Sequence, residues 1–431
     1  MSGFPDTRRL LAAALSSALL CAAPAARPAG AVTRPASDPS CSWGGEVSVD
    51  EHNALFPESH AAYWATAFTV HPDLRIGLSG AFPDSRFASL TVYRGEGGAF
   101  SVNGVDSTLT DYEIAPDPGT SNPWQPEPYQ PHQPHQPHRL HRPAGTYTAD
   151  MVLDPSPGAV NTLPLAPAGT ADGTLGRLIY RVYLPAGGDF GAVPLPQLTL
   201  YRDGGSTTLP VCDDDGGTTV LAGEPAARPA DEPADISFVR PPAEFGLLPN
   251  TDSGYVAATV TPPAGDQVLV IRGRGARSAH GDHPSVWPRH DLDLRYWSMC
   301  TNLDNAQRSL VVNPLPDGST DYGCRDDDET VLDASGYYTF VVGTEAQRAA
   351  IEQIPGVTFV PWSAARPHAQ HLIFLRNMLA NRGFGPAIQN VTADQDPATA
   401  QAVMGEYYPR DAICPLATVE TAGAGACLDG S

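Results

Sequence analysis

Short runs of alternating apolar and polar residues follow one another closely along the chain. Residues 74–80 (LRIGLSG), 87–93 (FASLTVY) and 99–104 (AFSVNG) are examples, and clusters of Pro, Gly and Asp separate them. Such alternation indicates half-buried strands, because successive side chains of a strand point to opposite faces. The 44 Pro and 41 Gly residues would interrupt long helices. The pattern predicts a mainly β protein of the sandwich or jelly-roll type.

The C-terminal third of the chain departs from this pattern. Residues 344–354 predict a short amphipathic helix that ends at Pro355, and residues 397–408 predict a second helix. We therefore expect a few short helices near the C-terminus, beside the β structure.

Two parts of the chain repeat each other. FPDSRFASLTVY (82–93) returns as DLDLRYWSMCTN (291–302), and residues 54–72 align without a gap with residues 246–264. This alignment places Pro57 opposite Pro249 and Tyr63 opposite Tyr255. Residues 176–185 also resemble residues 336–343, with Tyr180 opposite Tyr338. A repeat this long predicts two homologous lobes from an internal duplication, since solenoid units are shorter, about 20 to 50 residues.

Both copies of the repeated strand carry an Asp-x-Arg pair, Asp84 with Arg86 and Asp293 with Arg295. Alternation places the two members of each pair on one face of the strand. In one interpretation the pairs line a cleft between the lobes and bind a polyhydroxylated or anionic ligand. In the other, each is an ion pair that orients its strand within a lobe, because a feature that holds a fold together recurs with the fold.

The first 31 residues have the features of a secretory signal peptide. Arg8 and Arg9 precede an apolar run at residues 10–23, and Ala-Gly-Ala at 29–31 is a small-x-small cleavage site. No later apolar run reaches 18 residues, so we expect no membrane span. The prediction is a secreted, extracellular protein, with attachment to the cell wall left open.

Composition shifts suggest the domain boundaries. We expect a disordered leader at residues 32–45 and a first β lobe at 46–220 that contains a Pro/His-rich insertion at 117–145. The Pro, Ala and acidic residues of 221–235 are typical of an interdomain linker. The second β lobe, with the C-terminal helical segment and tail, then occupies residues 236–431.

The chain is strongly acidic, with 48 acidic and 26 basic residues and a formal net charge of −22. An acidic surface repels the phosphates of nucleic acid, so nucleic-acid binding is not expected. All 26 basic residues are Arg, and with the abundance of Ala, Gly and Pro this indicates a bacterial genome of high GC content.

Six of the seven Cys residues follow the signal peptide, an even number that favours three disulfides in an exported protein. Six Cys residues allow 15 connectivities. The pairs Cys300–Cys324 and Cys414–Cys427 are favoured as local closures, which leaves Cys41–Cys212 to join the ends of the first lobe. No CxxC motif occurs, which argues against a thiolate zinc site and a redox motif.

Three regions are candidates for metal ions. His280, His283 and His290 lie beside acidic residues in the loop 276–290, and imidazole with carboxylate suits zinc or copper. Acidic runs follow Cys212 and Cys324, and clustered carboxylates in a Gly-containing turn suit calcium, although Asp is also an ordinary turn residue. No cofactor is assigned, and zinc, copper and calcium remain the alternatives.

The Pro/His-rich insertion places four His residues three positions apart, at 132, 135, 138 and 141. In a polyproline II helix these side chains share one face but lie about 9 Å apart, too far to share an ion. A metal site there requires the segment to bend, and the alternative is a solvated linker.

The sequence lacks G-x-S-x-G, HExxH, a P-loop and a GxGxxG after a strand. We therefore predict a non-catalytic binding protein or an envelope-associated protein. Its ligand would be a glycan or another small polar molecule, in a site between the lobes. The alternatives are a metal-dependent secreted hydrolase that uses His280 and His283, and a purely structural envelope protein. The sequence leaves the oligomeric state open.

The second lobe resembles an uncharacterised group of exported, two-lobed, β-rich proteins from high-GC bacteria. The segments that carry the resemblance are VLVIRGRGA (268–276), DLRYWSMC (293–300), DASGYYTFVVG (333–343), HLIFLRNML (371–379), AIQNV (387–391) and VMGEYYPR (403–410). At a greater distance the chain is similar to the paired domains of unknown function in bacterial envelope proteins. The resemblance implies a two-lobed β-rich fold and gives no residue a catalytic role.

Overall fold

The structure, a computed structural model, describes residues 39–54, 56–94, 97–126, 145–213, 236–242, 248–305 and 307–429. The predicted signal peptide, the four regularly spaced His residues of the insertion and the predicted linker at 221–235 lie outside the described residues. We call residues 39–213 the first half and residues 236–429 the second half.

The first half is built almost entirely from strands. They are β1 (Ala61–Thr69), β2 (Arg75–Ala81), β3 (Ser85–Tyr93), β4 (Ser101–Val102), β5 (Val105–Asp106), β6 (Thr108–Thr110), β7 (Thr146–Val152), β8 (Thr162–Pro164), β9 (Leu175–Pro185), β10 (Gln197–Arg202) and β11 (Gly205–Thr208). Three short 3-10 helices accompany them, η1 (Asp111–Glu113), η2 (Ala186–Gly188) and η3 (Phe190–Ala192).

The second half combines strands with short helices. Its strands are β12 (Ser253–Val260), β13 (Gln267–Arg274), β14 (Leu294–Leu303), β15 (Val312–Pro314), β16 (Thr320–Tyr322), β17 (Cys324–Asp326), β18 (Tyr337–Gly343), β19 (Thr358–Pro361), β20 (His371–Ala380) and β21 (Arg410–Pro415). Its helices are α2 (Glu345–Ile351), η5 (Ile388–Asn390), α3 (Pro397–Met404), η6 (Gly405–Tyr407), α4 (Leu416–Ala422) and α5 (Ala424–Leu428). The mainly β class and the few short helices near the C-terminus are confirmed.

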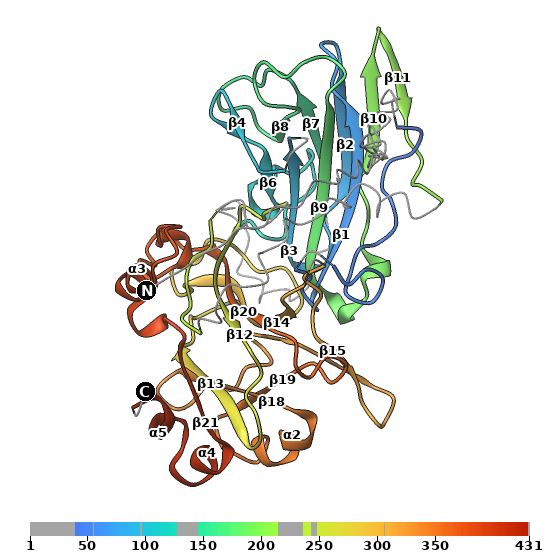
Figure 1. The fold of residues 1–431 in the computed structure, drawn as a ribbon. Coiled ribbons are helices and arrows are strands. Elements are labelled where there is room, and N and C mark those ends of the chain that lie inside the picture. Colours follow the sequence, from blue (N-terminus) through green and yellow to red (C-terminus); the bar gives the residue numbers. More distant parts are fainter. Residues whose placement is uncertain are drawn as a thin grey trace, which may run out of the picture. The chain divides into compact units, whose positions relative to one another are not determined.

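The main strands form four sheets (Figure 1). Sheet 1 has the order β1-β9-β3-β6 and sheet 2 the order β11-β10-β2-β7-β8, both in the first half. Sheet 3 has the order β12-β20-β14-β17 and sheet 4 the order β19-β18-β13-β21, both in the second half. Among the described residues, no helix has both the length and the apolar character that crossing a membrane requires.

The two halves order their strands in the same way. Sheets 1 and 3 match strand for strand, and β10-β2-β7-β8 of sheet 2 matches β21-β13-β18-β19 of sheet 4. In both halves one pair is parallel, β7 with β8 and β18 with β19. The correspondence pairs β9 with β20, so the alignment of residues 176–185 with 336–343 is wrong. It matched β9 to β18 because both segments place a Tyr among apolar residues shortly after a Gly, a pattern that does not specify the sheet.

Each half has its own core between its two sheets. In the first half, alternate residues of sheets 1 and 2 pack together, among them Leu90, Tyr180 and Leu78. In the second half, sheets 3 and 4 pack together through residues such as Met299, Ile373 and Phe340. Burial of these apolar faces is the main favourable contribution to folding.

The central strands of sheets 1 and 3 are buried on both faces. All nine residues of β3 are buried, as are nine of the ten residues of β14. The faces that do not point to the two cores meet in a smaller cluster that contains Phe87, Tyr183, Tyr296 and Met378. Sheets 1 and 3 therefore form the contact between the halves.

Buried ion pairs cross this contact in both directions. Arg295 in β14 donates to both carboxylate oxygens of Asp111 in η1, each at 3.1 Å. Arg86 in β3 donates to Asp327, which directly follows β17, at 2.5 Å. Ser89 lies opposite Thr110, and Ser298 lies opposite Asp326. Asp111 and Asp327 therefore occupy matching places. The Asp-x-Arg motif thus pairs each Arg with the other half, and neither Arg pairs with its own Asp.

Two segments outside the strands differ from their predicted character. Residues 39–45, expected in a disordered leader, include Trp43, whose side chain is fully buried and whose Nε1 donates to the Pro196 carbonyl. Residues 122 and 124 of the expected insertion are buried, and Trp124 Nε1 donates to the Arg86 carbonyl at 3.1 Å. In both segments a Trp anchors the chain to the core of the first half.

The structure contains three disulfides, Cys41–Cys212, Cys300–Cys324 and Cys414–Cys427. They join the same cysteines as the pairs favoured from the sequence. Cys300 and Cys324 are directly opposite on β14 and β17, and this places the acidic run after Cys324 at the edge of sheet 3.

We predict that Arg295→Met and Arg86→Met each lower the free energy of unfolding by about 3–5 kcal/mol, because each leaves a buried carboxylate without its partner. Urea unfolding followed by circular dichroism measures the change. Arg289→Met is the control, because Arg289 forms an exposed pair with Asp291, and exposed pairs contribute little. Equal effects of the buried and exposed substitutions would contradict the structural role of the crossed pairs.

Candidate functional site

The structure places the four residues predicted to bind a ligand in a different arrangement from the expected one. Arg86 and Arg295 are fully buried. Asp84 Oδ1 lies 2.8 Å from His283 Nδ1, and Asp293 accepts a 2.7 Å hydrogen bond from Arg277. Neither buried guanidinium group reaches solvent, so a dissolved ligand does not meet them in this conformation.

The structure does not bring His280, His283 and His290 together. His280 lies beside Asp328 at 2.5 Å, whereas His283 lies beside Asp84. Within the described ranges, side chains that could ligate a metal gather in groups of three at two places, and neither group contains these three His residues.

One of the two groups is suited to a metal ion. The first consists of Glu58, Cys300 and Cys324, but its two cysteines form a disulfide and offer no thiolate. The second consists of His60, Asp326 and Glu329, which combines one imidazole with two carboxylates. His60 precedes β1 and Asp326 ends β17, so this group joins the two halves.

His60 and Asp252 occupy matching places in the two halves. They align in the sequence repeat, directly before β1 and β12. The His60 carbonyl accepts a 2.9 Å hydrogen bond from Leu184, and the Asp252 carbonyl accepts a 2.8 Å hydrogen bond from Leu379. Both Leu residues have positive φ, 48° and 47°, which is rare for a bulky side chain. Strained backbone of this kind concentrates at functional positions. The surroundings of His60 and Asp252 are therefore both candidate sites.

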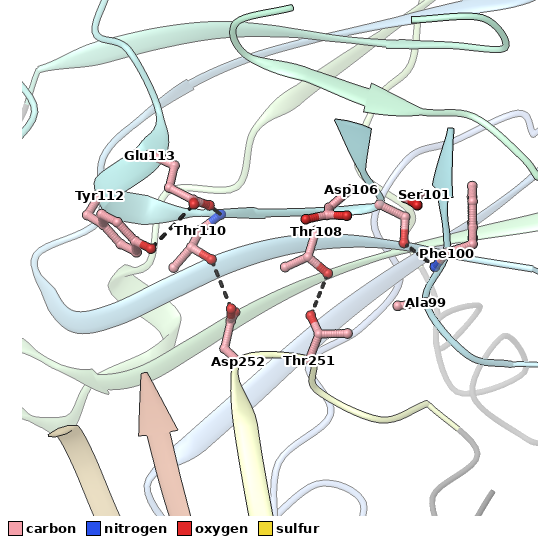
Figure 2. Close-up of a pocket in the computed structure, with 11 residues that line it drawn as sticks. Ala99, Phe100, Ser101, Asp106, Thr108, Thr110, Tyr112, Glu113, Thr251 and Asp252 are labelled. Carbon is pink, nitrogen blue, oxygen red and sulfur yellow. Dashed lines mark hydrogen bonds between the residues drawn. The ribbon is translucent and has the colours of Figure 1, made fainter. Parts of the chain in front are cut away.

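A pocket of about 440 Å³ opens beside Asp252 (Figure 2). It is formed by β6 and η1, by the chain around β4 and β5, and by the segment that leads into β12. Nine of its eleven lining residues carry a side-chain oxygen, and none is basic: Ser101, Asp106, Ser107, Thr108, Thr110, Tyr112, Glu113, Thr251 and Asp252, with Ala99 and Phe100 completing the wall. The volume lies in the range of small-molecule sites.

Hydrogen bonds fix the polar groups of the pocket. Thr110 Oγ1 donates to Asp252 Oδ1 at 3.0 Å, and the hydroxyls of Thr108 and Thr251 lie 2.8 Å apart (Figure 2). Glu113 accepts a hydrogen bond from the Thr110 N–H at 3.3 Å, as expected of a Thr-x-x-Glu sequence at a helix start. The pocket walls are therefore held together across the two halves.

Burial raises the pKa of Asp252 to about 7, with smaller contributions from the negative charges of Glu113 and Asp111, although the hydrogen bond from Thr110 opposes the shift. The second carboxylate oxygen, Oδ2, is buried and has no hydrogen-bond partner within the described part of the chain. Burial also raises the pKa of Tyr112, so its hydroxyl is neutral and can donate. The pocket thus contains a carboxyl group that exchanges its proton near neutral pH.

The sequence did not identify most of this site. Thr110, Glu113 and Asp252 lie in short, ordinary segments that no motif marks. The repeat did align His60 with Asp252, and a pair of polar residues before matching apolar strands was the available signal. The acidic run after Cys324, which the sequence marks as a calcium candidate, supplies Asp326 and Glu329 to the group with His60.

Comparisons with known proteins give little further information. No protein-family model and no curated protein matches the chain. A crystal structure of an uncharacterised protein from Burkholderia cenocepacia is similar, with a TM-score of 0.48 and 14% identity over 88% of this chain and 83% of that chain. The VPA0106 protein from Vibrio parahaemolyticus has a TM-score of 0.37 and 11% identity over 83% and 89%. These structural neighbours are bacterial proteins of unknown function.

The raised pKa of Asp252 predicts a pH-dependent stability. The folded protein retains the Asp252 proton up to about pH 7, whereas the unfolded chain loses it near pH 4. The folded state therefore binds more protons in this window, and stability falls as pH rises through it. Asp252→Asn resembles the protonated carboxyl and avoids this loss. We expect its melting temperature, relative to wild type, to increase from pH 5 to pH 8.

The control is Asp106→Asn, which removes one exposed carboxylate from the same pocket wall. If the melting temperatures of Asp252→Asn and wild type change equally from pH 5 to pH 8, the pKa of the Asp252 carboxyl is not raised in the folded protein.

Proposed function

We propose that this protein is a secreted, non-catalytic binding protein for a small polyhydroxylated molecule, a sugar or a related polyol. The observation that carries the proposal is the ring of side-chain oxygens around the pocket beside Asp252. Hydroxyl groups donate to and accept from sugar hydroxyls, and carboxylate groups accept from them. Phe100 and Tyr112 add aromatic surface to the wall.

The charge of the pocket favours a neutral ligand over an anion. Asp106, Glu113 and Asp252 contribute carboxyl groups, and no Arg or His lines the wall. An anion would meet negative charge without a basic partner. Of the two ligand classes expected from the sequence, the pocket therefore supports the polyhydroxylated one.

The rival hydrolase has less support. It relies on His280 and His283, which each lie beside a different carboxylate. Within the described residues, these side chains do not join a group of three possible ligands.

We also infer that each half is a β-sandwich and that the two halves arose by duplication. The matching strand orders and the parallel pairs β7 with β8 and β18 with β19 support this inference. Pockets between two like lobes are common sites for small ligands, and the proposed site is lined by residues of both halves.

Glycan binding tests the proposal directly. The mature protein is applied to an array of neutral mono- and oligosaccharides, and the best ligand is then titrated by calorimetry. We expect Glu113→Gln to weaken that binding at least about tenfold, since a hydrogen bond to a charged group contributes about 1.5–3 kcal/mol.

Glu329→Gln is the matched control, because Glu329 has the same place in the second half as Glu113 has in the first. It should leave sugar affinity unchanged. An array without any signal above background, or equal losses in the two variants, would refute sugar binding in this pocket.

A further inference from the structure

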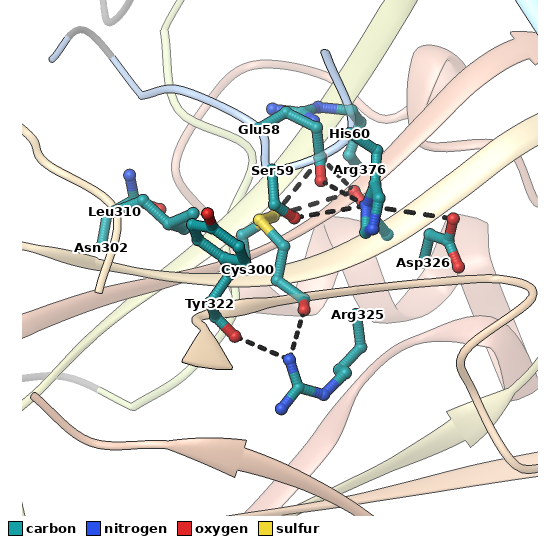
Figure 3. Close-up of a disulfide and its surroundings, with 12 residues drawn as sticks. Glu58, Ser59, His60, Cys300, Asn302, Leu310, Tyr322, Arg325, Asp326 and Arg376 are labelled. Carbon is teal, nitrogen blue, oxygen red and sulfur yellow. Dashed lines mark hydrogen bonds and ion pairs between the residues drawn. A yellow bond between two sulfur atoms is a disulfide. The ribbon is translucent and has the colours of Figure 1, made fainter. Parts of the chain in front are cut away.

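The first half carries a different set of side chains where the second half has Asp252. His60 lies among three carboxylates, and Figure 3 shows Glu58 and Asp326 near its ring. His60 Nδ1 is 3.5 Å from Glu58 Oε1 and 3.9 Å from Asp326 Oδ2, and Nε2 is 3.5 Å from Glu329 Oε2. One ligand atom from each of His60, Asp326 and Glu329 lies within 4.8 Å of the others.

Two ligand atoms at about 2.1 Å from a tetrahedral zinc ion are about 3.4 Å apart, somewhat closer than the 4.8 Å limit within which these three atoms lie. Asp326 faces Nδ1 and Glu329 faces Nε2, so one of these carboxylates must move to join an ion on either nitrogen. Glu329, whose side chain is 45% exposed, can make such a movement at the solvent side.

A second observation also points to a cation site. Glu58 is fully buried, and its Oε1 has no hydrogen-bond partner among the residues that the structure describes. Its other oxygen, Oε2, accepts from Arg376 and from Ser298. The unpartnered oxygen is the one that faces His60. A buried carboxylate oxygen without a partner is costly, and a cation beside His60 would satisfy it.

The carboxylates are held in place by their surroundings. Asp326 Oδ1 accepts hydrogen bonds from the N–H groups of Asp328 and Glu329, at 3.0 and 2.9 Å. Its Oδ2 is the oxygen that faces His60. The Cys300–Cys324 disulfide ties β17 to β14 two residues before Asp326. Supporting contacts of this kind orient the ligands of metal sites.

We propose that His60, Asp326 and Glu329 bind a divalent transition-metal ion, with Glu58 Oε1 as a further oxygen for its coordination sphere. Imidazole nitrogen suits Zn²⁺ and similar ions, and carboxylate oxygen suits Mn²⁺ as well as Zn²⁺. The site is distinct from the proposed sugar pocket and does not depend on it. Because His60 and Asp326 belong to different halves, the ion fastens the two halves together.

A proton competes with the metal ion at this site. Binding of the metal requires the neutral imidazole of His60, so affinity is expected to be higher at pH 8 than at pH 6.

The experiment uses the mature chain, residues 32–431, after removal of metals with a chelator. His132, His135, His138 and His141 are changed to Gln in the parent protein, so that the Pro/His-rich insertion does not bind the probe. Zn²⁺ and Mn²⁺ are titrated separately by calorimetry at pH 6 and pH 8, and melting curves are recorded with and without each ion.

We expect one equivalent of at least one of these ions to bind, more tightly at pH 8, and to raise the melting temperature. His60→Gln should weaken binding by more than about 100-fold, since even the loss of a supporting residue costs about 10- to 100-fold. Glu329→Gln removes an exposed ligand and should also reduce affinity, which keeps the test valid if His60→Gln does not fold. His283→Gln is the matched control and should bind as the parent does.

Three results would overturn the proposal. In the first, the parent protein binds neither ion. In the second, Glu329→Gln and His60→Gln both keep the metal affinity of the parent. In the third, His283→Gln loses as much metal affinity as they do.

Discussion

Two charged side chains that are withdrawn from water, Arg86 and Arg295, determine how the halves of this protein fit together. Each guanidinium group is fully buried and finds its carboxylate in the other half, Asp327 or Asp111. A buried charge without a partner is strongly unfavourable. Neither half can therefore satisfy its own charges alone. The reciprocal pattern is the one expected when two like units pack about a twofold axis.

The same contact places the two candidate sites at matching positions. Asp252 in the second half faces Thr110 in the first, and His60 in the first half faces Asp326 in the second. A common framework thus holds two chemically different groups. Hydroxyl and carboxyl groups surround Asp252 and suit a polyol. An imidazole and carboxylates surround the other position and suit a metal ion.

The sequence predicted the features that depend on local pattern. The alternation of apolar and polar residues predicted the strands. The repeat identified Arg86 and Arg295 as corresponding residues of the two halves. It did not show where those side chains pair, because their partners Asp111 and Asp327 are distant in sequence and belong to the other half. The matching strands β9 and β20 were also missed. Their equivalence depends on position within a sheet, and they share little local sequence.

The central claim is that the two halves form one cooperative unit because their buried charges are shared. Hydrogen exchange measured by mass spectrometry at increasing urea concentration tests this claim, with peptides from β9 (Leu175–Pro185) and β20 (His371–Ala380) reporting on the two halves. The account predicts one urea midpoint for both peptides. Two clearly separated midpoints would show that each half folds without the other and would contradict the account.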